Sequence, residues 1–87
     1  MTLDDLRAVL AGLEGVPGDT PVILSKDAEG NRFSPLVEVE HAMYLADSTY
    51  SGERYISEAE RLAKPDPEEY AEAPEDAVPA IFLWPVN

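Results

Sequence analysis

The apolar run Ala80–Trp84 (AIFLW) places the strongest constraint on the fold of this chain. It carries apolar side chains on both faces of an extended segment, which is typical of a strand inside a sheet. Residues 78–85 are therefore predicted to form a strand near the centre of a sheet. No apolar stretch is longer, and this one is far too short to cross a membrane, so we expect no membrane contact.

Two earlier segments also have the patterns of strands. Residues 21–25 contain three aliphatic residues in succession and predict a short buried strand. Residues 37–45 alternate: one face carries Val37, Val39, Met43 and Leu45 with His41 among them, and the other carries Glu38, Glu40, Ala42 and Tyr44. We expect the valine side to be buried and the other side to be wet. The stretch 26–31 (KDAEGN) is predicted to reverse the chain between them.

Residues 2–14 predict an amphipathic helix. Thr2 is placed to cap it, and Asp5 lies three residues later, where a capping-box acid belongs. Gly15 is expected to take the left-handed position after the helix, and Pro17 prevents continuation. The apolar stripe of the helix consists of Leu3, Leu6, Val9, Leu10 and Leu13.

The second half of the chain is more polar. Residues 46–54 (ADSTYSGER) predict a polar loop. Ser57 and Glu60 resemble a capping box and predict a short helix over 58–63. Residues 64–77 (KPDPEEYAEAPEDA) hold six acids and three prolines without apolar periodicity, so they predict a mobile acidic loop.

Together these elements predict a single α+β domain over residues 1–87. The N-terminal amphipathic helix is expected to pack on a small, mainly antiparallel sheet of three or more strands, with the acidic loop before the last strand. The expected core, which needs no ligand, consists of Val22, Leu24, Val39, Phe82 and Leu83.

The charge balance indicates the class of partner. Eighteen Asp and Glu face six Lys and Arg, which gives a net charge of −12. Phosphate backbones and anionic lipids repel such a chain, so we expect no direct nucleic-acid or membrane binding and favour a protein with a basic surface. The chain has no cysteine, which excludes disulfides and thiolate metal sites. Acids near Met1 do not fit a signal peptide, and a cytoplasmic location is expected.

Two groups of residues are candidates for binding that partner. The acidic loop presents Glu68, Glu69, Glu72, Glu75 and Asp76, whose carboxylates could imitate the phosphates of a nucleic acid. The alternative is a loop that only aids solubility. Tyr50 and Tyr55 lie in the segment STYSGERY, where exposed tyrosines make contact anchors of low entropic cost. The alternative there is a lid over the sheet edge.

We predict no catalytic residue, cofactor or metal. Asp27–Glu38 spaces oxygen ligands as a calcium loop does, but Arg32 stands where that loop requires glycine. His41 is the only histidine and lacks converging ligands. No nucleophile elbow, phosphate-binding loop or HExxH motif is present. The chain is therefore interpreted as a binding protein and not as an enzyme.

Three segments carry a resemblance: DTPVILSKDAEGNRFSPL, STYSGERY and EDAVPAIFLWPVN. They resemble a family of small, uncharacterised acidic proteins of actinobacteria and their phages, with the pattern PVxLSxDxEGNxxSPL before a terminal LWP strand. The resemblance covers most of the chain except the acidic stretch. It implies an accessory protein encoded by a phage or prophage and acting in the bacterial cytoplasm. The alternatives are a nucleic-acid mimic that inhibits a host nuclease or defence complex, and a structural protein that self-associates through sheet edges.

Overall fold

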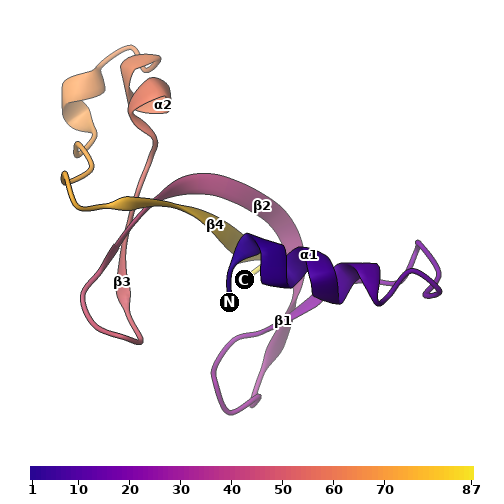
Figure 1. Ribbon diagram of the computed structural model, residues 1–87. Helices are drawn as coiled ribbons and strands as arrows, with labels where there is room; N and C mark the ends of the chain where they lie inside the picture. The colour runs from indigo at the N-terminus through magenta and orange to yellow at the C-terminus, as the bar shows by residue number, and fades with distance from the viewer. The chain divides into compact units, whose positions relative to one another are not determined.

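The computed structural model describes residues 1–87 and contains two helices, one 3-10 helix and four strands (Figure 1). In chain order the elements are α1 (Leu3–Ala11), β1 (Ile23–Ser25), β2 (Phe33–Ala46), β3 (Gly52–Tyr55), α2 (Glu58–Leu62), η1 (Pro67–Glu69) and β4 (Val78–Pro85). The predicted α+β class is confirmed, because an N-terminal helix precedes a four-stranded antiparallel sheet. None of the helices has the length and apolar character that a bilayer crossing requires.

The chain divides into two compact units, which are described separately. The terminal unit comprises residues 1–38 and 83–87, and the central unit comprises residues 39–82. Strands β2 and β4 each contribute residues to both units.

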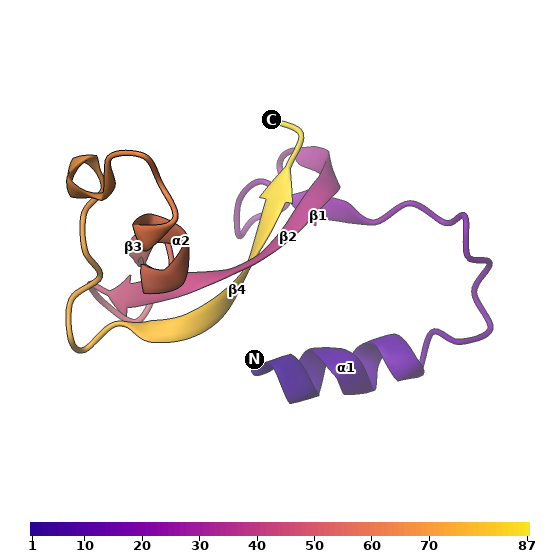
Figure 2. The same cartoon turned by 90° about the horizontal axis from the view of Figure 1, so that it is seen from above.

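Strand β2 is the central strand of the sheet (Figure 2). It pairs with β1 from Ile23↔Pro35 to Ser25↔Phe33, with β3 from Met43↔Tyr55 to Ala46↔Gly52, and also with β4. The prediction that 78–85 is a strand is confirmed, but its central place is wrong. With 14 residues, β2 has the length to pair with three neighbouring strands. In β4, which pairs with β2, the side chains of Ile81, Leu83 and Trp84 are exposed.

The loop predicted over 46–54 is also wrong in its second half, where β3 begins at Gly52. The backbone amides of Asp47 and Ser48 donate to the Ser51 carbonyl at 2.9 and 3.1 Å, which closes a hairpin between β2 and β3. A four-residue strand with two charged side chains has too little apolar pattern to reveal itself in the sequence.

Helix α1 has the predicted capping box. The Asp5 amide donates to Thr2 Oγ1 at 3.1 Å, and the Thr2 amide donates to Asp5 Oδ2 at 2.9 Å. These bonds with Thr2 lower the pKa of the Asp5 carboxyl. The left-handed position predicted for Gly15 is wrong, because the helix ends at a right-handed Gly12 and further turns continue to Val16. Gly30 alone has a positive φ, at 71°.

Burial in β2 departs from the prediction at Val37, Val39 and Ala42, although Glu38 is exposed and Met43 and Leu45 are half-buried. Val37 and Val39 are 61% and 63% exposed, whereas Ala42 is 1% and Ser34 is 5% exposed. The second face can be covered because its polar groups have partners. The Asn87 amide donates to Ser34 Oγ at 3.2 Å, for example.

The predicted core is accordingly wrong in most of its members. Val22, Val39 and Leu83 are exposed, and only Leu24 and Phe82 are half-buried. The Phe82 ring packs edge-on against Tyr44, with 6.2 Å between centroids. In α1 the apolar stripe is exposed except for a half-buried Leu6, so its predicted burial is not seen in the isolated chain.

Candidate functional site

A shallow groove of about 320 Å³ opens on the central unit. One side is formed by β3 and the residue after it, and the other by the chain that follows η1. The lining residues are Glu53, Arg54, Tyr55, Ile56, Tyr70 and Ala71. The groove therefore brings Tyr55, one of the two predicted anchors, beside the acidic loop.

The two predicted tyrosines do not form one patch. Tyr55 is half-buried at the end of β3, opposite Met43, and lines the groove. Tyr50 lies in the turn before β3, is 90% exposed and is not among the lining residues. Four residues, 51–54, separate them in the sequence. Tyr55 thus has a shaped environment, whereas Tyr50 is a single exposed side chain.

The predicted acids are all exposed and lie along the acidic loop. Glu68 and Glu69 belong to η1, and Glu72, Glu75 and Asp76 follow it. Between the two groups lies Tyr70, which the sequence prediction did not include in the site. Its position inside a run of acids is visible in the sequence, but its place in the same groove as Tyr55, 15 residues earlier, is not.

Arg61 ties the acidic loop to α2. Its Nε and Nη2 donate to the two carboxylate oxygens of Glu58 at 3.0 and 2.7 Å, and its Nη1 donates to the Pro67 carbonyl at 3.1 Å. The bond with Glu58 raises the pKa of Arg61, and the nearby charges of Glu72 and Glu68 raise it further. The same bond lowers the pKa of Glu58. This anchor holds the start of η1 beside α2.

Two further contacts position the aromatic side of the groove. Lys64 Nζ lies 5.4 Å from the Tyr70 ring centroid and 3.8 Å from Glu60 Oε1. A cation over an exposed ring contributes about 0.5–1 kcal/mol, enough to favour one ring orientation. The predicted helix over 58–63 is confirmed as α2, and Ser57 Oγ caps it by accepting from the Glu60 amide at 3.1 Å.

Arg54 reaches the groove already paired. Its Nε and Nη2 donate to Glu40 Oε1 and Oε2 at 2.7 and 2.5 Å. Glu40 lies on β2 and Arg54 on β3, so this forked pair crosses the hairpin. Such two-point geometry fixes the guanidinium plane more firmly than a single contact would. The groove thus combines two tyrosines, an isoleucine and a held cation.

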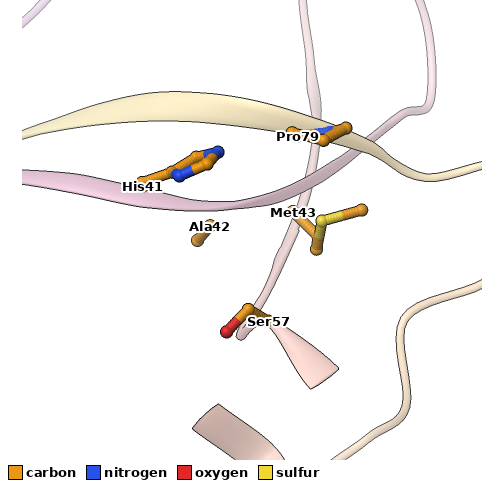
Figure 3. Close-up of a pocket in the computed structure, with 5 residues that line it drawn as sticks. All are labelled: His41, Ala42, Met43, Ser57 and Pro79. Carbon is orange, nitrogen blue, oxygen red and sulfur yellow. The ribbon is translucent and has the colours of Figure 1, made fainter. Parts of the chain in front are cut away.

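A second hollow of about 150 Å³ in the central unit is lined by His41, Ala42, Met43, Ser57 and Pro79 (Figure 3). The Ser57 hydroxyl already serves as the cap of α2. A nucleophile needs a base within hydrogen-bond reach, and no His41–Ser57 hydrogen bond is formed.

In the turn that resembles a calcium loop, the Asp27 carboxylate accepts hydrogen bonds from the turn itself. Asp27 Oδ1 accepts the amides of Glu29 and Asn31 at 2.9 and 3.2 Å, and the bond from Asn31 is the main cause that lowers the Asp27 pKa. Asn31 Nδ2 also donates to Glu29 Oε2 at 3.2 Å. No three acidic, histidine or cysteine side chains gather anywhere to hold a metal ion.

No protein-family model matches the chain, and neither a curated protein nor a solved structure is significantly similar to it. The geometry of the groove is therefore the basis for a functional proposal.

Proposed function

We propose that this protein is a non-enzymatic accessory protein that binds another protein through the groove of the central unit. The observation that carries the proposal is the meeting of Tyr55 and Tyr70 in one open groove with Arg54 held between strands. The resemblance to proteins of actinobacteria and their phages supports a phage or prophage origin and action in the cytoplasm of the host cell.

The chemistry of the groove suits a protein side chain better than a small substrate. Tyrosine provides a large contact area that is polar at its tip and loses little conformational entropy. Sites for small molecules usually enclose most of the ligand, whereas this groove is shallow and open. A partner would therefore place an apolar or aromatic side chain between Tyr55 and Tyr70.

The charge around the groove favours a basic partner. Residues 39–82 contain eleven Asp and Glu against three Lys and Arg, a net charge of −8. Glu68, Glu69 and Glu72 are exposed next to the lining residues Tyr70 and Ala71. Exposed charge of one sign speeds the approach of an opposite surface, while aromatic contacts contribute more to the affinity.

The test is a calorimetric titration against the protein that co-purifies from the native host. Tyr55→Ala and Tyr70→Ala should each weaken binding by about 2 kcal/mol, roughly 30-fold, as buried aromatic anchors do. Tyr50→Ala is the matched control, because it removes the same side chain outside the groove, and its loss should be smaller. The affinity should fall only weakly between about 50 and 500 mM salt, because screening reduces the attraction between charges but not the aromatic contacts.

A nucleic-acid mimic is the second candidate, and the Arg61 anchor favours it. A mimic requires carboxylates held at fixed positions, and Arg61 fixes the residue before Glu68 and Glu69. In that case affinity should fall steeply with salt. Reversal of Glu68, Glu69, Glu72, Glu75 and Asp76 to Lys should abolish binding, and the tyrosine variants should bind normally. That pair of results would reject the groove and support the mimic.

A further inference from the structure

The groove beside β3 runs along the edge of that strand. Successive residues of a strand point to opposite faces of its sheet, so a hollow on one face touches only alternate residues. Here the lining residues of this wall are consecutive, from Glu53 to Ile56. Strand β3 pairs with β2 and with no other strand. The groove therefore follows the outer edge of β3, which has no neighbouring strand.

The hairpin register determines which main-chain groups face this outer edge. The Asp47 amide donates to the Ser51 carbonyl at 2.9 Å, and hydrogen-bonded positions of an antiparallel pair recur at every second residue. The ladder bonds to β2 therefore involve the odd-numbered residues of β3. The main chain of the even-numbered residues, from Gly52 to Ile56, is directed away from β2 and toward the outer edge.

Extended backbone is present on both sides of the groove. Tyr70, on the wall that follows η1, has φ −108° and ψ 132°. On the other side, the chain is still extended at Ser57, two residues after the end of β3, with φ −64° and ψ 154°. An extended chain is the occupant whose backbone matches both sides.

The charges of the central unit favour a basic occupant. Its three bases are all ion-paired with acids of the same unit, as Arg54–Glu40, Arg61–Glu58 and Lys64–Glu60. The other eight of its eleven acids form no ion pair within it. Glu53 is one of them and lines the groove, and Glu69 and Glu72 flank the other wall in the sequence. An occupant with lysine or arginine side chains complements these charges, whereas an acidic one is repelled.

The same charges disfavour a second copy of the chain as the occupant. Each central unit has a net charge of −8, and like charges opposite each other destabilise a pair of strands. Edges that must not pair are commonly protected by proline, by a bulge or by being short. Strand β3 has no proline and no bulge in its register, and only its length of four residues limits pairing. Its edge is thus open to a chain of opposite charge.

We infer that the partner inserts an extended basic segment, which adds to the outer edge of β3 as a further strand. This inference rests on the proposed function and specifies the backbone shape and the charge of the partner. In this mode main-chain hydrogen bonds contribute affinity, and alternate side chains give specificity. An apolar side chain of the segment lies beside Tyr55 and Tyr70, and a basic one lies beside Glu53.

The first experiment removes one outward-facing amide. Proline is tolerated at an edge position whose amide faces away from the sheet, so Ile56→Pro leaves the bonds between β2 and β3 in place. Ile56→Ala is the matched control, because it shortens the same side chain and keeps the amide. In titrations against the co-purified partner, Ile56→Pro should bind about 5- to 10-fold more weakly than Ile56→Ala, as a lost hydrogen bond predicts. Equal affinities of the two variants, with folding verified by circular dichroism, would reject the added strand.

The second experiment uses a synthetic probe, an acetylated and amidated octapeptide of alternating lysine and valine. In large excess, this peptide should slow hydrogen exchange at the amides of Gly52 and Ile56. The amides of Glu53 and Tyr55 already bond to β2 and should slow less. The matched control is the octapeptide of alternating glutamate and valine, which should have no effect because the charges repel it. Equal slowing at all four amides, or none with the lysine peptide, would contradict the inference.

The added strand and the proposed function can fail separately. Normal partner binding by both Tyr55→Ala and Tyr70→Ala rejects the groove, and the added strand with it. Loss of binding in these variants, with equal affinities of Ile56→Pro and Ile56→Ala, keeps the groove as the binding site and rejects only the strand. A wild-type dimer that Ile56→Pro dissociates would place a second copy on this edge and reject the basic segment.

Discussion

The two faces of β2 differ in a way that runs against their composition. On one face Phe33, Val37 and Val39 are exposed. On the opposite face Ser34 and Ala42 are buried and Glu40 is half-buried. Polar groups can be covered when each has a partner, and Ser34 and Glu40 both have one. Whether a strand face is covered and whether it is apolar are therefore separate properties.

The largest expected difference in the free energy of unfolding comes from introducing a lysine on either face of β2. Ala42→Lys would bury an ammonium group without a partner and should lower the free energy of unfolding by about 3 kcal/mol or more. Val39→Lys places that group in solvent and should change the value by no more than about 0.5 kcal/mol in the monomer. Urea unfolding of dilute protein measures both. Equal losses in the two variants would mean that Val39 is covered as well.

A smaller effect should follow from Gly52, which lies on the covered side of the hairpin. A methyl group there would come within 2.5 Å of the Leu45 carbonyl and of the Tyr44 ring. Tyr44 and the strand must shift, so Gly52→Ala should cost about 1–3 kcal/mol, as overpacked sites do. Gly18→Ala is the control, because nothing lies within 4 Å of its added methyl group, and it should be neutral or slightly stabilising. Thermal unfolding of both variants tests the difference.

The smallest effect concerns the capping box at the start of α1, a helix whose apolar side chains are mostly exposed. The hydrogen bonds with Thr2 hold the folded-state pKa of Asp5 below that of an unperturbed aspartate, so its contribution to stability is present above about pH 4 and is lost as the pH falls through the folded pKa. Asp5→Asn should thus lower the melting temperature at pH 7 and have progressively less effect below pH 4. Asp19→Asn serves as the control. A difference that does not depend on pH would show that the carboxylate charge contributes nothing to the cap.

Local patterns predicted the local structure well. The Thr2–Asp5 capping box, the Ser57 cap and the bounds of β4 could all be read from neighbouring residues, because each depends on contacts within a few positions. Alternation also showed which residues of β2 share a face. It could not show which face is covered, because the polar groups of that face find partners far away in the sequence: Arg54 for Glu40, and Asn87 for Ser34.

The groove was predictable only in parts. Tyr55 and the acids are visible as residue types, but the approach of Tyr70 to β3 depends on the return of the acidic loop after η1. That return is fixed where Arg61 meets the Pro67 carbonyl, a main-chain atom that no side-chain pattern marks. Strand β3 itself was missed because GERY lacks an apolar alternation.

The Arg61 contact has a consequence for how this sequence can diverge. Its acceptors are one carboxylate on its own helix and one main-chain oxygen, and every residue type supplies the latter. Substitutions along 66–76 can therefore accumulate without loss of the anchor, whereas lysine in place of Arg61 would lack the planar fork that meets both acceptors together. Across a lineage, we expect this single arginine to persist while the loop it holds drifts in composition.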